Sequence, residues 1–202
     1  MEFKIENTQV YGLSKSIIAS GNAMRTEMDD NTLDVQEGDK HFKRACNLGT
    51  TKSGEGHDNF LTGIIVQFDL YAPLYMWKQL QRYHFLDFIS SQSTMHRLTK
   101  FNVAECCVGD TDEVILERYQ QLFNSYYYYE EHNQKEESKQ LWRTLVASLP
   151  CGFVLGATMT TNYRQLKNIY HQRKNHRLSE WHEFCSWCES LPYFKELCLG
   201  GN

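Results

Sequence analysis

The sequence lacks several features that would place it quickly in a large class of proteins. It has three prolines in 202 residues, and its longest clean apolar run covers only residues 63–66. A membrane-spanning helix needs about 20 apolar residues, so we expect a soluble chain without membrane segments. The length suits a single domain with a sizeable core and excludes long repeat arrays.

An excess of positive charge is also absent. Lysine and arginine total 21 against 25 acidic residues, giving a net charge of -4 and a pI near 6.1. No global field therefore attracts nucleic acid or an anionic membrane, and an anionic ligand must be bound by a local cluster. Residues 1–6 show no basic segment followed by an apolar stretch, so we expect no secretory signal and a cytoplasmic location.

Seven cysteines make an odd number, which favours reduced thiols over a disulfide framework. Cys185 and Cys188 have the spacing of a redox or zinc pair, but a zinc site needs two further ligands and no second pair exists. Because free cysteine often acts as a small buried hydrophobe, we interpret both thiols as structural and expect no metal.

The pattern of apolar residues predicts a mixed α+β chain, mostly helical, that forms one domain over residues 1–202. The predicted strands are 3–11 and a buried central one at 59–71; the predicted helices are 13–20, 73–88, 111–129 extending toward 146, and 161–189. Between the first helix and the central strand, residues 21–58 are polar with almost no apolar period, which predicts a long loop.

Most of the chemistry is concentrated in residues 162–177, which are basic within an acidic chain. The segment is either a solvated basic helix face or a local anion-binding site. Arg173 lies four residues after Ile169 and seven after Leu166, so helical geometry places it on their apolar stripe, facing the interior. A buried guanidinium needs a carboxylate partner or a bound anion or carbonyl.

A second constellation lies near the predicted helix after Pro73. Gln79 and Arg82 share one face at i, i+3, and a serine-rich stretch follows at 90–94. An amide, a guanidinium and hydroxyls at a helix break suit a phosphate and a pyrimidine. Such residues are common on helices, so alone they predict only a polar pocket. No histidine or cysteine has the sequence context of an activated nucleophile.

Together the two constellations resemble the flavin-dependent thymidylate synthases. Residues 149–173 begin with Leu-Pro, continue from 160 with Thr-Thr-Asn-Tyr-Arg-Gln-Leu-Lys-Asn and end at Arg173. The family has Leu-Pro, then Thr-x-Asn-x-Arg-x-Leu-x-Asn and an arginine five residues on, without a gap. Residues 57–68 and Ala72-Pro73 resemble the family's strand and helix start, and residues 79–84 fall on its Gln-x-x-Arg-His-Arg signature.

The resemblance implies an α+β fold with a mixed sheet and long helices, assembled as a homotetramer with active sites between subunits. It implies methylation of dUMP to dTMP with FAD as cofactor and NADPH and methylenetetrahydrofolate as co-substrates. Arg173 would polarise the pyrimidine as the catalytic residue. The implied substrate-binding residues are Gln79, Arg82, Gln92, Ser93, Thr94 and Arg173; those implied for the cofactor are Arg82, His84, Ser91, Asn162, Arg164, Asn168 and Arg177.

The sequence also departs from the family's signature. Tyr83 and His84 stand where the family has His-Arg, and Met95 and Val146 replace two arginines. The family's Asn-Glu before the signature serine is replaced by Ser90-Ser91 or nearby residues. Losing a charged hydrogen bond to an anion typically costs about 1.5–3 kcal/mol. Two alternatives therefore remain open: a related pyrimidine-nucleotide enzyme with another product, such as a hydroxymethylated one, and a non-catalytic relative that binds nucleotide or flavin.

Overall fold

The computed structural model describes residues 1–28, 34–52 and 54–201. Four strands form one antiparallel sheet in the order β1-β2-β4-β3. The strands are β1 (Lys4–Tyr11), β2 (Ile65–Pro73), β3 (Asp87–Ser91) and β4 (Val154–Asn162). The mixed α+β class is confirmed, but the prediction of a mixed sheet is wrong, because apolar alternation marks the buried face of a strand and not the direction of its neighbour.

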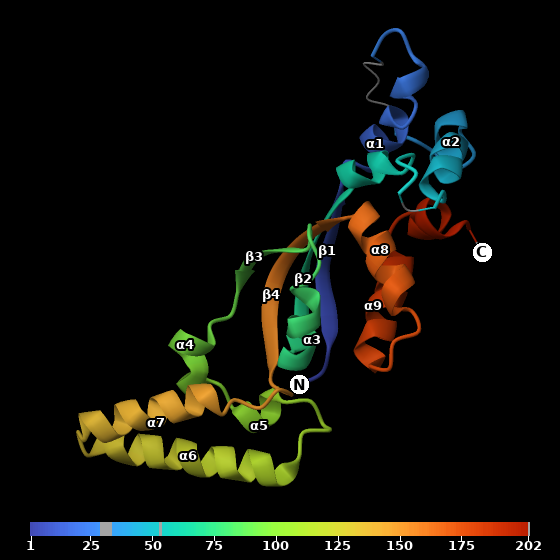
Figure 1. Cartoon of the computed structure of the whole chain (residues 1–202). Helices are drawn as coiled ribbons and strands as arrows, with labels where there is room; N and C mark the ends of the chain where they lie inside the picture. The colour runs from blue at the N-terminus through green and yellow to red at the C-terminus, as the bar shows by residue number, and fades with distance from the viewer. Residues whose placement is uncertain (29–33, 53, 202) are drawn as a thin grey trace. The chain divides into compact units, whose positions relative to one another are not determined.

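Helices make up most of the remaining structure (Figure 1). The α-helices are α1 (Leu13–Ala19), α2 (Lys40–Gly49), α3 (Leu74–Leu80), α4 (Thr94–Arg97), α5 (Val103–Cys106), α6 (Glu113–Glu131), α7 (Lys135–Ala147), α8 (Tyr163–Arg173) and α9 (Ser179–Ser190). Short turns of other helix types cover Asn22–Met24, Asn59–Gly63, Leu98–Lys100 and Lys195–Leu199. Among the described residues, no helix is long and apolar enough to cross a membrane.

The predicted loop at 21–58 is interrupted by α2. Its buried residues Phe42, Ala45 and Gly49 lie three and four positions apart on one face, while the other faces are polar. So few apolar residues leave almost no period in the sequence, which explains why the helix was not predicted. The predicted loop also includes residues 29–33 and 53, which lie outside the described residues.

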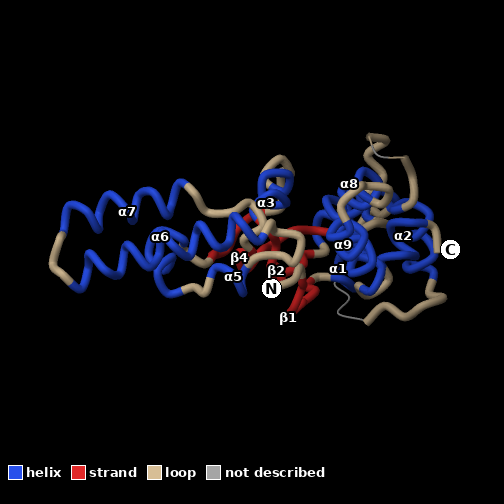
Figure 2. The backbone as a smooth tube through the Cα atoms, turned by 90° about the horizontal axis from the view of Figure 1, so that it is seen from below, coloured by secondary structure: helices blue, strands red, loops and turns tan. Residues whose placement is uncertain are grey.

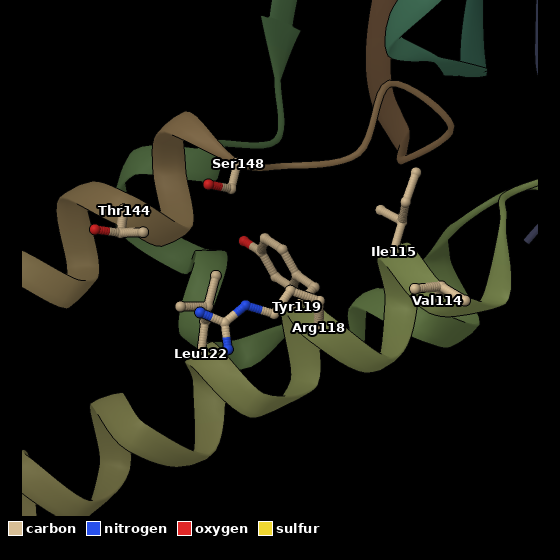
Figure 3. Close-up of a pocket in the computed structure, with 7 residues that line it drawn as sticks. All are labelled: Val114, Ile115, Arg118, Tyr119, Leu122, Thr144 and Ser148. Carbon is tan, nitrogen blue, oxygen red and sulfur yellow. The ribbon is translucent and has the colours of Figure 1, made fainter.

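The chain divides into two compact units. Unit 1 comprises Met1–Lys4, Leu70–Arg82 and Ser90–Ala157. Within it, α6 and α7 run side by side as a helical hairpin, seen from two directions in Figures 1 and 2. Its core gathers Leu98, Val103, Cys106, Cys107, Tyr119, Phe123, Leu145 and Phe153.

Unit 2 comprises Ile5–Asp69, Tyr83–Ile89 and Thr158–Asn202. Helix α8 packs against α9 and against the 3-10 turn at Asn59–Gly63. The largest buried side chains of this unit include Trp181, Tyr163, Phe68, Phe184 and Phe194. The basic segment predicted to carry the chemistry is therefore built on a helix that is fixed by a large apolar core.

Candidate functional site

Helix α8 begins at a residue that the sequence assigned to the cofactor site. Asn162 ends β4 in extended geometry, and its Oδ1 accepts a hydrogen bond from the backbone N–H of Gln165 at 2.9 Å. This side chain is the N-cap of α8, a position where asparagine is strongly preferred. The cap leaves Nδ2 of Asn162 as its donor group.

Arg164, the second residue of α8, is held by two residues that precede β2. Its Nη1 donates to Asn59 Oδ1 at 2.7 Å, and its Nε lies 3.1 Å from Asp58 Oδ1 as an ion pair. The Arg164 side chain is 33% exposed, whereas that of Asp58 is 2% exposed. Asp58 and Asn59 therefore fix the orientation of the guanidinium, while part of the Arg164 side chain reaches the surface.

A cavity of about 430 Å³ opens beside these groups within unit 2. It brings together three of the residues predicted to bind cofactor: Asn162, Arg164 and Asn168. Its full lining is Thr62, Ile65, Phe85, Asn162, Arg164, Gln165 and Asn168. The lining combines side-chain amides and a guanidinium with the apolar side chains of Phe85 and Ile65, which suits a flat ring system that carries polar edges.

Phe85 is a member of this cavity that sequence reasoning missed. Its φ of 60° lies in the left-handed region, which is unusual for a bulky residue, and its side chain is 68% exposed. Thr161 Oγ1 donates to the Phe85 carbonyl at 2.7 Å and so holds the strained segment. Strained backbone of this kind gathers at functional sites. Nothing in the local sequence marks Phe85, because the strain depends on β4.

Arg173 ends α8 beside two aromatic side chains that the sequence did not predict. Its Nε donates to Tyr83 Oη at 2.6 Å, and its guanidinium lies over the rings of Trp181, 4.6 Å from the centroid, and Tyr83, 5.5 Å away. Tyr83 Oη in turn donates to Gln172 Oε1 at 3.1 Å. Arginine stacks favourably on aromatic faces, so these rings and the Tyr83 hydroxyl help to accommodate a half-buried guanidinium.

The predicted residues of unit 1 are distributed along the chain from α3 to the start of α4. Gln92 is fixed to β4, because its Oε1 accepts from the Gly156 N–H at 2.9 Å and its own N–H donates to the Gly156 carbonyl. Ser93 caps α4 by accepting from the His96 N–H at 3.2 Å. Gln79 lies on α3, Arg82 follows that helix, Ser91 ends β3 and Thr94 begins α4.

The predicted set is thus shared between the two units. Gln79, Arg82, Ser91, Gln92, Ser93 and Thr94 belong to unit 1, and His84, Asn162, Arg164, Asn168, Arg173 and Arg177 belong to unit 2. His84 and Arg177 are exposed and are not among the residues that line the 430 Å³ cavity. The structure therefore gathers Asn162, Arg164 and Asn168, and gives Arg173 its own aromatic setting.

The cysteines fit the structural interpretation. Cys185 and Cys188 are buried in α9, and burial raises the pKa of Cys185 to about 11 and that of Cys188 well above its ordinary value. A thiol that resists ionisation is a poor nucleophile and a poor metal ligand. All seven cysteines are free, and the described residues contain no cluster of three or more acidic, histidine or cysteine side chains able to hold a metal ion.

The fold is that of the flavin-dependent thymidylate synthases, as two comparisons show. Thymidylate synthase X from Helicobacter pylori, solved with FAD and dUMP, matches with a TM-score of 0.70 at 15% identity over 98% of both chains. A second structure of that enzyme, also with FAD and dUMP, gives a TM-score of 0.64 at 17% identity over the same share of each chain.

A third structure shows the same likeness for a different enzyme. A UMP/dUMP methylase from Streptomyces cacaoi, bound to 5-Br dUMP, matches with a TM-score of 0.59 at 14% identity, covering 93% of this chain and 91% of the other. No protein-family model matches the sequence, and no curated protein matches it. The resemblance seen in the sequence is therefore confirmed as a remote one that extends over the whole fold.

Proposed function

We propose that this protein is a flavin-dependent enzyme that methylates dUMP to dTMP, with methylenetetrahydrofolate and NADPH as co-substrates. The observation that carries the proposal is the cavity at Asn162, Arg164 and Asn168, which lies on the motif that resembles the family's. The likeness to two structures of thymidylate synthase X solved with FAD and dUMP, each matched over 98% of this chain, supports the proposal.

FAD fits the groups around the cavity of unit 2. The Asn162 and Asn168 amides can pair with the polar edge of a flavin ring, and the exposed Phe85 ring gives a flat apolar surface. The Arg164 cation can neutralise a flavin phosphate. When bound, FAD supplies the hydride transfer of the reaction. The protein's task is to hold the ring and exclude water.

For the nucleotide we propose that Arg173 binds and polarises the pyrimidine, with Gln79, Arg82, Gln92, Ser93 and Thr94 as further contacts. The hydrogen bond to Tyr83 and the stacking on Trp181 hold the guanidinium in one orientation, which reduces the entropy lost when it binds a planar ligand. A fixed cation beside a uracil carbonyl stabilises negative charge that develops there in the transition state.

We further propose that the chain works as a homotetramer. Tyr127 and Tyr128 on α6 are 42% and 55% exposed, and Val114 and Ile115 at its start are 71% and 51% exposed. Tyrosine is enriched at protein interfaces. Sedimentation of the purified protein tests this directly: a single species of four chains is expected, and a monomer at assay concentration would contradict it.

The proposed reaction is tested by product analysis. Protein supplied with FAD, NADPH, dUMP and labelled methylenetetrahydrofolate should yield a nucleotide heavier than dUMP by one labelled methyl group, detected by mass spectrometry. The same mixture without the protein is the control. Protein that binds dUMP in calorimetry but yields no new nucleotide would refute catalysis and leave only nucleotide binding.

A second candidate keeps the fold and changes the nucleotide or the product. The likeness to a UMP/dUMP methylase favours it, as does the engagement of Tyr83 with Arg173, because Tyr83 stands where the family has histidine. The same mass analysis, run with UMP beside dUMP, separates a ribonucleotide methylase from a thymidylate synthase. A product heavier by a hydroxymethyl group would show an altered reaction.

A further inference from the structure

A buried lysine lies one turn along α8 from the arginine of the cavity. Lys167 Nζ donates to the Gly49 carbonyl at 2.7 Å, the Thr51 carbonyl at 2.8 Å and Asp58 Oδ2 at 3.0 Å. Three acceptors are the full complement of a protonated amine. The side chain is only 3% exposed, so this ammonium is held entirely by protein groups.

The carboxylate of Asp58 serves two cations at once. Its Oδ2 binds Lys167, and its Oδ1 lies 3.1 Å from Arg164 Nε. One negative and two positive charges leave this trio with a net charge of +1. Asp58 alone with Arg164 would leave that pair neutral. Lys167 is therefore the residue that makes the trio cationic.

Of these three residues, only Arg164 brings the excess positive charge to the surface of the cavity. Lys167 and Asp58 are almost fully buried, whereas Arg164 is 33% exposed and lines the 430 Å³ cavity. None of the seven residues that line this cavity carries a carboxylate, although Asp87 lines a smaller hollow of about 170 Å³ that shares Asn162, Ile65 and Phe85 with it. Because buried charges are poorly screened by salt, the field of Lys167 persists at the cavity.

We propose that Lys167 sets the preference of this cavity for anionic ligands, through its share of the Asp58 carboxylate. This inference rests on the proposed flavin site, and it assigns a specificity role to a residue that does not line the cavity. The cavity takes phosphate-bearing flavin over neutral flavin because Arg164 retains a charge that Asp58 cannot cancel. FAD and riboflavin share the same ring system and differ in the phosphates, so together they isolate the effect.

A purely structural role is the alternative, since Lys167 also joins the end of α2 to α8. The two roles differ in what they do to the two flavins. If Lys167 only stabilises the packing of α2 against α8, its loss weakens the binding of FAD and of riboflavin equally. If its charge matters, its loss weakens the binding of FAD selectively and lowers the ratio of the riboflavin Kd to the FAD Kd.

The experiment measures both dissociation constants by flavin fluorescence in wild type and Lys167→Gln. Glutamine removes the charge and keeps an amide donor for the carbonyls of Gly49 and Thr51. We expect the FAD Kd to rise about tenfold, the order set by one unit charge acting across a partly buried site, while the riboflavin Kd changes less than twofold. Lys43→Gln removes an exposed charge from α2 as the matched control, and its ratio should equal that of wild type.

Arg164→Gln keeps the test decisive if Lys167→Gln does not fold, because this side chain is partly exposed. This variant removes the cation that lines the cavity, and it should lower the ratio of the riboflavin Kd to the FAD Kd at least as much as Lys167→Gln does. If the ratio of the riboflavin Kd to the FAD Kd is unchanged in either variant, or if the wild type shows no preference for FAD, the proposed role of Lys167 is overturned. The proposed function would still stand. Wild-type protein that binds neither flavin overturns the proposed function, and this inference with it.

Discussion

At the scale of single residues, helical geometry predicted the burial of Arg173 but not its neighbours. The period of α8 placed it on the stripe of Leu166 and Ile169, and the residue is indeed half-buried. Its neighbours were beyond prediction, because Tyr83 and Trp181 come from other segments of the chain. The aromatic faces of both residues stabilise the guanidinium by cation–π stacking.

Replacing Arg173 with alanine should weaken dUMP binding at least tenfold and leave the assembly intact. Loss of a charged hydrogen bond to the ligand costs about 1.5–3 kcal/mol, which raises the Kd roughly tenfold to more than a hundredfold. Calorimetry with dUMP and sedimentation of the same sample check both halves of the prediction. Arg173→Lys, which keeps the charge without the fork, is the matched control. If Arg173→Ala unfolds the protein, the residue is structural.

Glu189 on α9 should give the stability a defined pH dependence. Its Oε1 accepts from Tyr170 Oη at 2.6 Å, and its Oε2 lies 3.2 Å from Lys195 Nζ. The hydrogen bond from Tyr170, with help from Lys195, lowers the pKa of Glu189. A carboxyl whose pKa is lower in the folded state stabilises it above the unfolded value, near 4.3, and loses that contribution as pH falls through the folded pKa.

Urea unfolding of wild type and Glu189→Gln at several pH values tests this. At pH 7 the variant should be less stable by under about 1 kcal/mol, because the group is partly exposed. The difference should shrink steadily once the pH falls below about 4. A difference that stays constant from pH 7 to pH 3 would show that the charge of Glu189 contributes nothing.

At the scale of elements, the long helix predicted from 111 toward 146 is two helices. Helix α6 ends at Glu131 and α7 begins at Lys135, with Asn133 between them at a φ of 54°. Asparagine tolerates this left-handed conformation better than other residues with a Cβ. The turn has only a weak signal in the sequence, since the stretch contains neither glycine nor proline.

The hairpin turn makes a clear prediction about stability. Asn133→Ala should lower the free energy of unfolding by about 1 kcal/mol, because alanine pays the full cost of the left-handed conformation. Asn133→Gly should be neutral or stabilising by a few tenths of a kcal/mol, since glycine adopts positive φ freely. Urea denaturation of the three proteins measures this, and equal stability of the alanine variant would contradict the turn as described.

The other element that the sequence misplaced is the helix from 161 to 189. Residues through Asn162 belong to β4, and residues 174–178 separate α8 from α9. The start of α8 is set by the Asn162 cap, and β-branched residues just before it favour a strand. Similarly, the helix after Pro73 ends at Leu80, because β3 pairs with β4. Pairing with a distant strand is a tertiary effect that local pattern does not contain.

At the scale of the whole molecule, the family resemblance carried by residues 149–173 and 79–84 together predicted the fold, apart from the strand directions of its sheet. The match to thymidylate synthase X over 98% of both chains bears that out. The number of strands was not predictable, because β3 is exposed along its whole length and shows no buried alternation. A single domain and a tetramer stay predictions, and the chain itself divides into two compact units.

The candidate site was predictable only where its residues follow one another in sequence. Arg164 and Asn168 lie four residues apart on α8, Asn162 caps that helix, and all three meet at one cavity. Asp58, which orients Arg164, and Phe85, which lines the cavity, come from segments about 106 and 79 residues away. A single sequence carries no signal for contacts of that range.

The central claim is that this chain binds a flavin, and an absorption spectrum tests it most directly. The protein as purified, or after addition of FAD and removal of the excess, should show the two visible bands of a bound flavin with a stoichiometry of about one per chain. The Arg164→Gln variant, prepared identically, should retain less. A wild-type protein that stays colourless after FAD is added would show that the chain binds no flavin.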